Sequence, residues 1–368
     1  MTTRRIDQVI PSLASRDAIG GHVVQLRDLL RSRGFASDIY YGNATPDRLD
    51  HGYPIERIGD RPSAGRVLLY QLSIGSGLAD IFRDRPERKF VNYHNITPAG
   101  LLEDWIPAVG DEVRLGRAQM ETLAPLIEFA VADSRYNEEE LRALGYRSTL
   151  TVPLLLDLEG FAGRPDPVLA ARLASERADG GTSFLFVGKV SPHKGQHDLV
   201  KALAAYRRLY DPRARLRLVG GAISDNYRVA LERFIDELGL SDAVEIAGSV
   251  THEELIAYYG AADAFVCLSD HEGFCVPLLE AMYHRVPIVT WEFTAVPETV
   301  GAAGLVLADK RPARVAAAIH RVVGDAELRA ALAAAQSERV AAFALPSVQE
   351  RFASALEEAY AAGPGSDP

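Results

Sequence analysis

Short apolar runs of strand length alternate with longer helical or polar stretches along almost the whole chain. In the first half the runs lie at residues 6–10, 37–41, 66–71, 89–93, 129–132 and 150–152. In the second half they are SFLFVG, RLRLVGG, VEIAGSV, AFVCLS, PIVTW and GLVL. Apolar residues between these runs recur with the helical period, as they do over residues 23–30. The alternation predicts an α/β fold in which helices cover parallel sheets.

The composition changes between residues 157 and 181, where Pro, Gly, Arg and Asp become more frequent. We place a domain boundary there, with an N-terminal Rossmann-like domain over residues 1–165 and a C-terminal one over residues 166–345. Residues 346–361 are amphipathic and predict a helix, and the polar tail 362–368 predicts disorder. The chain has 368 residues, of which 48% are hydrophobic. A chain of this length and composition can bury two such cores.

The segment SDHEGFCVPLLEAM, residues 269–282, joins the apolar run 264–268 to a predicted helix. Gly273 permits a tight turn, and Pro277 suits the first turn of a helix because its missing N–H would have no intrahelical partner. The turn is therefore expected to present free backbone N–H groups, those of Phe274, Cys275 and Val276. The helix dipole favours negative charge at the same place, so the segment predicts a phosphate cradle.

Two carboxylates bracket this cradle. Glu272 precedes the turn, and Glu280 follows about one turn into the helix. The pair could hold the two ends of a molecule that has an anionic middle and hydroxyls on both sides, which is the shape of a nucleotide sugar. A structural alternative exists for Glu280, because the dipole makes glutamates common in the first turn of any helix.

Glu272 and Glu280, with GFCVPLLEAM around them, resemble the signature of the retaining GT-B glycosyltransferases of family four. The resemblance implies two Rossmann-like, doubly wound domains that face an interdomain cleft. In that family the first Glu contacts the transferred sugar and the second holds the ribose diol. The turn amides contact sugar and phosphate, which implies donor contacts from Gly273, Phe274, Cys275 and Val276.

A second unit, FVGKVSPHKGQ, places Lys189 and Lys194 after a predicted strand. Taken alone, both are most simply surface lysines. The family usually has Arg followed five residues later by Lys here, both on the donor phosphates, so the resemblance implies diphosphate binding. The chain departs from the pattern at Lys189, where a point charge replaces the planar fork of arginine. Val250 matches the family position whose backbone reads the nucleotide base.

In the N-terminal half, Gly20 and Gly21 end a polar loop between a strand and a helix, and His94 follows the run 89–93. Adjacent glycines and a lone histidine are weak signals on their own, and a histidine at such a position is more often structural. The resemblance implies that the glycine loop approaches the donor or acceptor and that His94 approaches the transferred sugar. It also suggests that Glu298 contacts the donor.

Two further residues have structural explanations. Ser134 precedes a helix rich in acidic residues, so a capping role is at least as good an interpretation as a ligand contact. Thr251 and Glu254 have the spacing of a capping box.

The net charge of −10 argues against a nucleic-acid partner. The two cysteines, Cys267 and Cys275, have neither zinc-ligand spacing nor the pattern of a disulfide framework. The N-terminus lacks the apolar stretch of a signal peptide, and no run of about 18 apolar residues could span a bilayer. We therefore expect a cytoplasmic protein. Peripheral contact with a membrane stays open, because lipid-linked acceptors reside there.

These observations predict a retaining hexosyltransferase that uses a nucleotide diphosphate sugar, GDP-mannose or a UDP-hexose, as donor. The donor would bind mainly to the second domain, and a saccharide, lipid-linked or small-molecule acceptor to the first. By resemblance the catalytic residues are Glu272, His94 and Lys194. The nucleotide sugar is a substrate, so no cofactor is expected, and the absence of Asp-x-Asp predicts metal independence.

Two other functions fit the same residues less well. A nucleotide-sugar 2-epimerase of GT-B fold is disfavoured by the paired glutamates. A noncatalytic nucleotide-sugar-binding subunit is disfavoured by the presence of Glu272, Lys194 and His94. The sequence does not name the donor, the acceptor, the linkage or the oligomeric state.

Overall fold

The computed structural model describes residues 4–14, 17–59, 65–178 and 180–363. The chain forms two compact units. Unit 1 contains residues 1–100, 108–156 and 343–368, and unit 2 contains residues 101–107 and 157–342. The chain thus enters unit 2 at residue 157, before the boundary that the composition suggested after residue 165. The short segment 101–107 also belongs to unit 2.

Unit 1 is built on a seven-stranded parallel sheet of order β3-β2-β1-β4-β5-β6-β7. Its strands are β1 (Arg5–Leu13), β2 (Ile39–Ala44), β3 (Tyr53–Pro54), β4 (Arg66–Leu72), β5 (Arg88–Tyr93), β6 (Phe129–Ala132) and β7 (Thr149–Thr151). Its α-helices are α1 (Ala18–Ser32), α2 (Gly77–Asp84), α3 (Pro107–Leu123), α4 (Arg135–Ala143) and α13 (Leu345–Ala362). The strands expected from the apolar runs are present, and β3 is an additional short edge strand.

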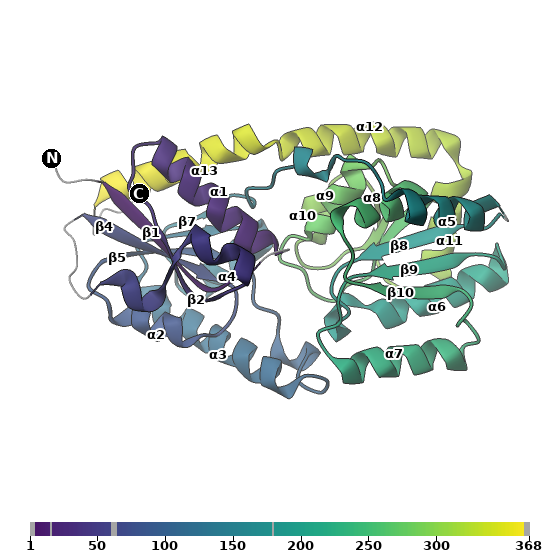
Figure 1. Ribbon diagram of the computed structural model, residues 1–368, viewed down its shortest axis with the longest axis horizontal. Coiled ribbons are helices and arrows are strands. Elements are labelled where there is room, and N and C mark those ends of the chain that lie inside the picture. Colours follow the sequence, from purple (N-terminus) through teal and green to yellow (C-terminus); the bar gives the residue numbers. More distant parts are fainter. Residues whose placement is uncertain (1–3, 15–16, 60–64, 179, 364–368) are drawn as a thin grey trace. The chain divides into compact units, whose positions relative to one another are not determined.

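Unit 2 has a six-stranded parallel sheet of order β10-β9-β8-β11-β12-β13. Its strands are β8 (Ser183–Val187), β9 (Arg215–Val219), β10 (Val244–Gly248), β11 (Ala264–Cys267), β12 (Ile288–Trp291) and β13 (Leu305–Leu307). Its α-helices are α5 (Pro167–Ala178), α6 (Gln196–Leu209), α7 (Asp225–Glu237), α8 (His252–Ala261), α9 (Val276–Tyr283), α10 (Val296–Val300), α11 (Pro312–Gly324) and α12 (Ala326–Ala342). Within the unit, α6 packs against α11, α5 against α8, and α9 against α12 (Figure 1).

Short 3-10 helices complete the connections. They are η1 (Pro46–His51), η2 (Ile55–Ile58), η3 (Ala99–Leu101), η4 (Ala124–Leu126), η5 (Glu159–Phe161) and η6 (Pro192–Lys194). The predicted alternation of strands and helices is therefore confirmed in both units.

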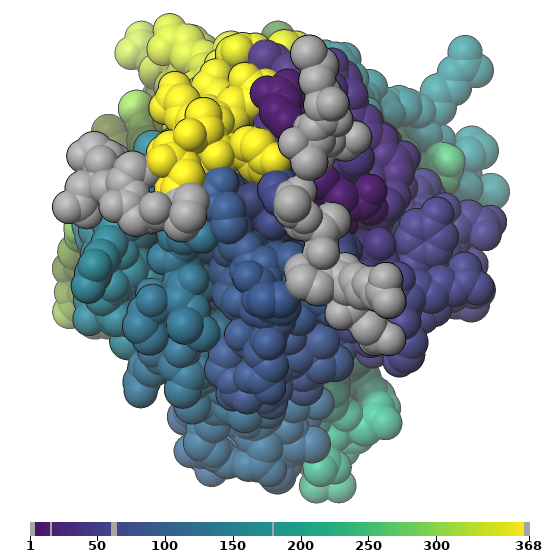
Figure 2. All heavy atoms as spheres, turned by 90° about the vertical axis from the view of Figure 1, so that its left-hand side faces the viewer, coloured from purple at the N-terminus to yellow at the C-terminus, as the bar shows by residue number. Residues whose placement is uncertain are grey.

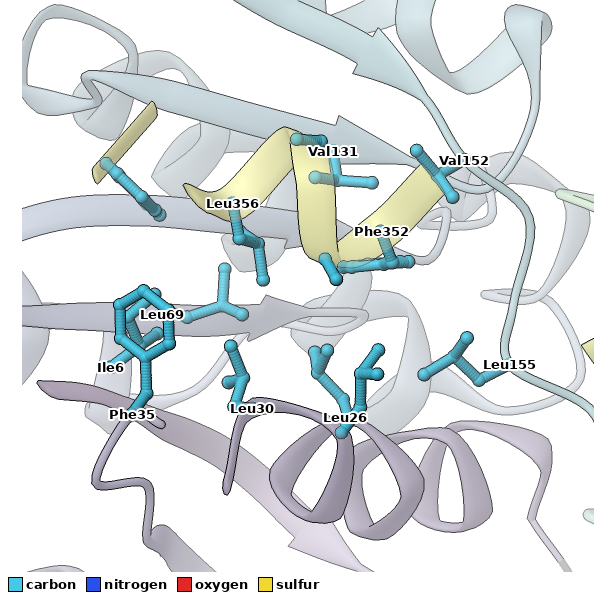
Figure 3. Close-up of a cluster of buried hydrophobic side chains, with 14 of the residues drawn as sticks. Ile6, Leu26, Leu30, Phe35, Leu69, Val131, Val152, Leu155, Phe352 and Leu356 are labelled. Atoms are coloured by element: carbon cyan, nitrogen blue, oxygen red, sulfur yellow. The ribbon is translucent and has the colours of Figure 1, made fainter. Parts of the chain in front are cut away.

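The C-terminal helix α13 completes the core of unit 1. Phe352 and Leu356 are fully buried in a cluster that also contains Ile6, Leu26 and Leu155, and Figure 3 shows these side chains pointing toward one another. The helix runs beside α1 although the two lie at opposite ends of the chain, and Figure 2 shows α13, in yellow, on the surface next to purple residues of the N-terminal region. Because burial of one large apolar side chain contributes about 1.5–3 kcal/mol, α13 is an integral part of unit 1. Of the tail 362–368, residues 364–368 lie outside the described part of the chain.

The sequence prediction was wrong about the position of the first glycine pair. Helix α1 begins at Ala18, so Gly20 and Gly21 lie in its first turn and not in a loop. A Cβ atom at Gly20 would lie 2.4 Å from the carbonyl oxygen of Ala14, whereas nothing lies within 4 Å of one at Gly21. Because glycine has no Cβ atom, Gly20 allows α1 to begin directly against the end of β1. This glycine is therefore required for close packing.

Candidate donor-binding site

The site in unit 2 lies where the strand order reverses, at the carboxyl ends of β8 and β11. In a doubly wound sheet this switch point is where the connections diverge and ligands bind. The loop after β8 carries the predicted lysines, and the loop after β11 carries Glu272 and the helix start. Gly195 has φ 68°, and a Cβ atom on it would lie 2.3 Å from the carbonyl oxygen of Leu268. Only glycine lets the two loops come this close.

Lys194 and Glu272 form an ion pair between these two loops. Lys194 Nζ lies 2.8 Å from each carboxylate oxygen of Glu272, and the side chains are 21% and 9% exposed. Burial alone would lower the pKa of Lys194, but the Glu272 carboxylate outweighs it, so this pKa is raised and the ammonium is kept. Two residues expected to contact different parts of a donor are therefore ion-pair partners of one another.

The turn before α9 carries backbone strain. Cys275 is the N-cap residue of α9 and has φ 70° and ψ 69°, a left-handed conformation that is uncommon for residues other than glycine. Pro277 lies in the first turn, as predicted. Within the described residues, no acceptor is found for the N–H groups of Cys275 and Val276. These two N–H groups support the anion cradle that the sequence predicted.

Thr294 holds the backbone of Glu272 from the loop after β12. Its Oγ1 accepts a hydrogen bond of 3.1 Å from the Glu272 N–H, and the N–H of Ala295 donates to the Glu272 carbonyl at 3.4 Å. Thr294 has φ 44°, which is an outlier for a β-branched residue. Nothing in the sequence marked this threonine, because neither its conformation nor its contact with Glu272 leaves a local pattern.

Glu280 is oriented by Tyr259, a residue of α8 that sequence reasoning missed. The Tyr259 hydroxyl donates to Glu280 Oε2 at 2.7 Å, and the Tyr259 ring stacks on His284 with centroids 5.0 Å apart. Burial raises the pKa of Glu280, while the bond from Tyr259 opposes that rise. The second carboxylate therefore stands half-buried on α9 with one oxygen already hydrogen-bonded.

Two further predicted donor contacts, Lys189 and Val250, are also in unit 2. Lys189 is exposed, and its carbonyl accepts a 2.9 Å bond from the buried Gln196, which ties the loop to the start of α6. Val250 is partly buried and lies between β10 and α8. Asp270, beside the motif, pairs with Lys310, which also reaches Asp198 at 2.7 Å.

His94, in unit 1, lies inside a buried polar network. The ring is fully buried, with Nδ1 2.9 Å from Asp133 Oδ2 and Nε2 2.6 Å from Gln71 Oε1. Gln71 must present its oxygen, because its amide nitrogen donates to Gln8, whose own amide donates to the Val23 carbonyl.

Oxygen acceptors thus face both nitrogens of His94. Burial raises the pKa of Asp133, while His94 opposes that rise. No ring nitrogen of His94 is left for a ligand in this arrangement, which favours the structural role that its position alone suggested.

The capping predictions are confirmed. Thr251 Oγ1 accepts from the Glu254 N–H, and the Glu254 carboxylate accepts from the Thr251 N–H, which is a complete capping box at α8. Ser134 caps α4 by accepting from the Asn137 N–H at 3.2 Å.

Residues 171–339 match the model of a family described as glycosyl transferases group 1. The match covers 169 residues, somewhat less than half of the chain. The glycosyl transferases group 1 region contains both loops of the candidate site, with Lys194, Glu272 and Glu280.

Curated relatives of this chain carry transferase names. A GDP-mannose-dependent alpha-(1-6)-phosphatidylinositol monomannoside mannosyltransferase of Mycobacterium tuberculosis is 33% identical over 201 residues, 52% of this chain and 51% of that protein. A D-inositol 3-phosphate glycosyltransferase of Geodermatophilus obscurus is 31% identical over 278 residues, 71% of this chain and 60% of that protein. The chain spans about half the length of the first curated relatives it matches.

Solved structures share the fold over nearly the whole chain. A sucrose-phosphate synthase of Thermosynechococcus elongatus has a TM-score of 0.74 and 19% identity and covers 98% of this chain and 100% of its own. HepE of Anabaena, in complex with UDP and glucose, has a TM-score of 0.74 and 17% identity, covering 96% and 99%. These likenesses show the GT-B fold, with its two Rossmann-like domains. Among the described residues, no helix combines the length and the apolarity that crossing a membrane would require.

Proposed function

We propose that the protein transfers a hexose from a nucleotide diphosphate sugar to a hydroxyl group of an acceptor, with retention of configuration and without a metal ion. The observation that carries this proposal is the Lys194–Glu272 ion pair at the switch point of the group 1 region. It places an ammonium and a carboxylate beside a helix start with free amides, which are the groups a sugar diphosphate requires.

In this proposal the diphosphate occupies the turn before α9. The N–H groups of Cys275 and Val276 donate to phosphate oxygens, and the helix start adds its dipole. Lys194 turns from Glu272 toward the phosphates, and the exposed Lys189 adds a second positive charge. Glu280, oriented by Tyr259, accepts hydrogen bonds from the ribose hydroxyls.

The reacting bond joins the anomeric carbon to the leaving phosphate oxygen. As it breaks, negative charge grows on the diphosphate, and Lys194 and the amides stabilise that charge. Glu272 binds the sugar hydroxyls, a role consistent with a carboxylate whose charge is already partnered by an ammonium. Substitution then occurs on the face that the leaving group departs from, and the departing phosphate oxygen takes the proton of the acceptor hydroxyl.

The relatives favour GDP-mannose as the first donor to test, because several are named as GDP-mannose-dependent. A UDP-hexose is the second candidate, since HepE was crystallised with UDP-glucose. The relatives' names also define the acceptor classes to test, which are inositol phosphates, phosphatidylinositol mannosides and polyprenol-linked saccharides.

The test is a panel of GDP-mannose, UDP-glucose and other nucleotide sugars incubated with purified protein, with and without each acceptor class. Acceptor-dependent release of nucleoside diphosphate, with an α-linked product by NMR, supports the proposal. Release that yields a free 2-epimeric sugar and needs no acceptor would establish the epimerase instead. Binding of nucleotide sugar without turnover under any of these conditions would establish the noncatalytic subunit.

A further inference from the structure

The chain's two cysteines meet at the centre of the donor site, although their spacing in the sequence indicated no common role. Cys267 is the last residue of β11, and Cys275 is the N-cap of α9, brought back by the tight turn between them. A carboxylate oxygen of Glu272 completes the group. These three ligand atoms all lie within 4.8 Å of one another, and all three residues are buried.

This set of ligands suits a thiophilic divalent cation. Cysteine thiolates and carboxylates are common ligands of Zn²⁺, and Zn–S bonds of about 2.3 Å in a tetrahedron place ligand atoms roughly 3.7 Å apart. The observed separations, all within 4.8 Å, would have to contract by up to about 1 Å to reach this geometry.

Lys194 is the obstacle to a cation at this place. Its ammonium occupies both oxygens of Glu272, so a cation can bind Glu272 only by displacing it. The Lys194 side chain is 21% exposed, so part of it already contacts solvent. A metal ion would therefore take the Glu272 carboxylate from Lys194.

We propose that the reduced protein binds one Zn²⁺ or Cd²⁺ ion through Cys267, Cys275 and Glu272, and that this ion excludes the sugar donor. The ion inhibits and takes no part in the transfer. It occupies the Glu272 carboxylate that the sugar needs and fixes the Cys275 turn whose amides the diphosphate needs. The exclusion of donor rests on the function proposed above, whereas the metal site itself does not.

The test is a titration of the full-length reduced protein with Cd²⁺, followed by the ultraviolet thiolate-to-cadmium charge-transfer band. We expect saturation at one ion per chain and at least a tenfold weaker affinity in Cys267→Ser and Cys275→Gly. Glycine suits the positive φ of residue 275, so the second variant separates a lost ligand from a lost fold. Glu272→Gln should weaken binding, whereas the exposed Glu292→Gln should not.

The outcomes separate the two halves of the proposal. Absence of the charge-transfer band, or equal binding in the cysteine variants, overturns the site. Loss of both thiols to a disulfide before metal can bind also overturns it, in favour of a redox pair. Nucleoside diphosphate sugar that binds equally well with and without Zn²⁺ overturns the exclusion. Failure of every nucleotide to bind the metal-free protein would instead count against the proposed function.

Discussion

The ammonium of Lys194 lies 2.8 Å from both carboxylate oxygens of Glu272, in a site where both side chains are largely shielded from water. A donor must therefore break an existing contact in order to make its own. Removing one partner of such a pair leaves the other charge buried and unpaired, which is costly. Donor binding must supply more free energy than breaking this ion pair costs. The affinity of Lys194 for the donor phosphates therefore depends on Glu272, and the affinity of Glu272 for the sugar depends on Lys194.

Lys194→Ala should reduce transition-state stabilisation by about 2–4 kcal/mol, because the charge that opposes the growing charge of the leaving diphosphate is lost. Lys189→Arg should be tolerated or raise turnover, since an exposed arginine can form bidentate bonds to phosphate. Steady-state kinetics with the donor from the release assay measure both. Near-normal kcat/KM for Lys194→Ala would show that Lys194 is only a structural ion-pair partner of Glu272.

Thr294 should affect the reaction through Glu272. Thr294→Val keeps the β-branched shape at positive φ but removes the oxygen that accepts from the Glu272 N–H, leaving a donor unsatisfied at a cost of about 1–3 kcal/mol. We expect kcat to fall roughly tenfold, which corresponds to about 1.4 kcal/mol. Thr294→Ser, which keeps the hydroxyl, should retain most of the activity. Equal kcat values for the Val and Ser variants would show that this hydrogen bond does not position Glu272.

Chelation of protein prepared free of Zn²⁺ should leave the transfer rate unchanged. Asp270-His271-Glu272 is the nearest substitute for an Asp-x-Asp motif, and its two carboxylates are engaged by Lys310 and Lys194 respectively. Rates measured in excess EDTA, then after addition of Mg²⁺ or Mn²⁺, test this expectation. A rate that collapses in EDTA and returns with either metal would contradict leaving-group stabilisation by lysine and amides.

Structural features could be predicted from the sequence where they have a local sequence pattern. Apolar runs and helical periods predicted the strands and helices, and the Thr251–Glu254 spacing predicted a capping box that is present. The glycine pair was misplaced because Gly-Gly is typical of loops, whereas here close packing against Ala14 requires the first glycine inside a helix. Local pattern does not distinguish these two uses of glycine.

Contacts between distant segments were beyond sequence reasoning. Tyr259 and Thr294 reach the two glutamates from other elements, and neither residue type signals its target. The meeting of Cys267 and Cys275 depends on the strand end and on the left-handed conformation of Cys275, which a cysteine does not indicate. Lys194 and Glu272 were each predicted to be functional, but only the structure shows that they are partners.

Buried His22 should make unit 1 sensitive to mild acid. Burial, with a smaller contribution from His94, holds the pKa of His22 well below its ordinary value. The ring Nδ1 accepts from the Leu155 N–H at 3.0 Å. Because the unfolded chain takes up a proton near pH 6.5 and the folded ring does not, stability is complete above that pH and declines below it by up to about 1.4 kcal/mol per pH unit.

Chemical denaturation between pH 7.5 and 5 measures this slope. His22→Asn, whose side-chain oxygen can still accept from Leu155, should flatten it by about one proton, although the variant is less stable overall. His51→Asn, a change at a partly exposed histidine of η1, serves as the control and should keep the wild-type slope. An unchanged slope in His22→Asn would mean that His22 is not the group that takes up the proton on unfolding.

The most direct test of the account is calorimetric binding of the bare nucleoside diphosphate, without sugar, to Glu272→Gln and Glu280→Gln. Glu280→Gln removes the charge that accepts the ribose hydroxyls and should weaken binding by about 1.5–3 kcal/mol. Glu272→Gln releases Lys194 from its partner, so affinity for the bare diphosphate should stay equal or rise, even as kcat for transfer falls. Loss of diphosphate affinity in Glu272→Gln, with wild-type affinity in Glu280→Gln, would contradict the assignment of the sugar to one glutamate and the ribose to the other.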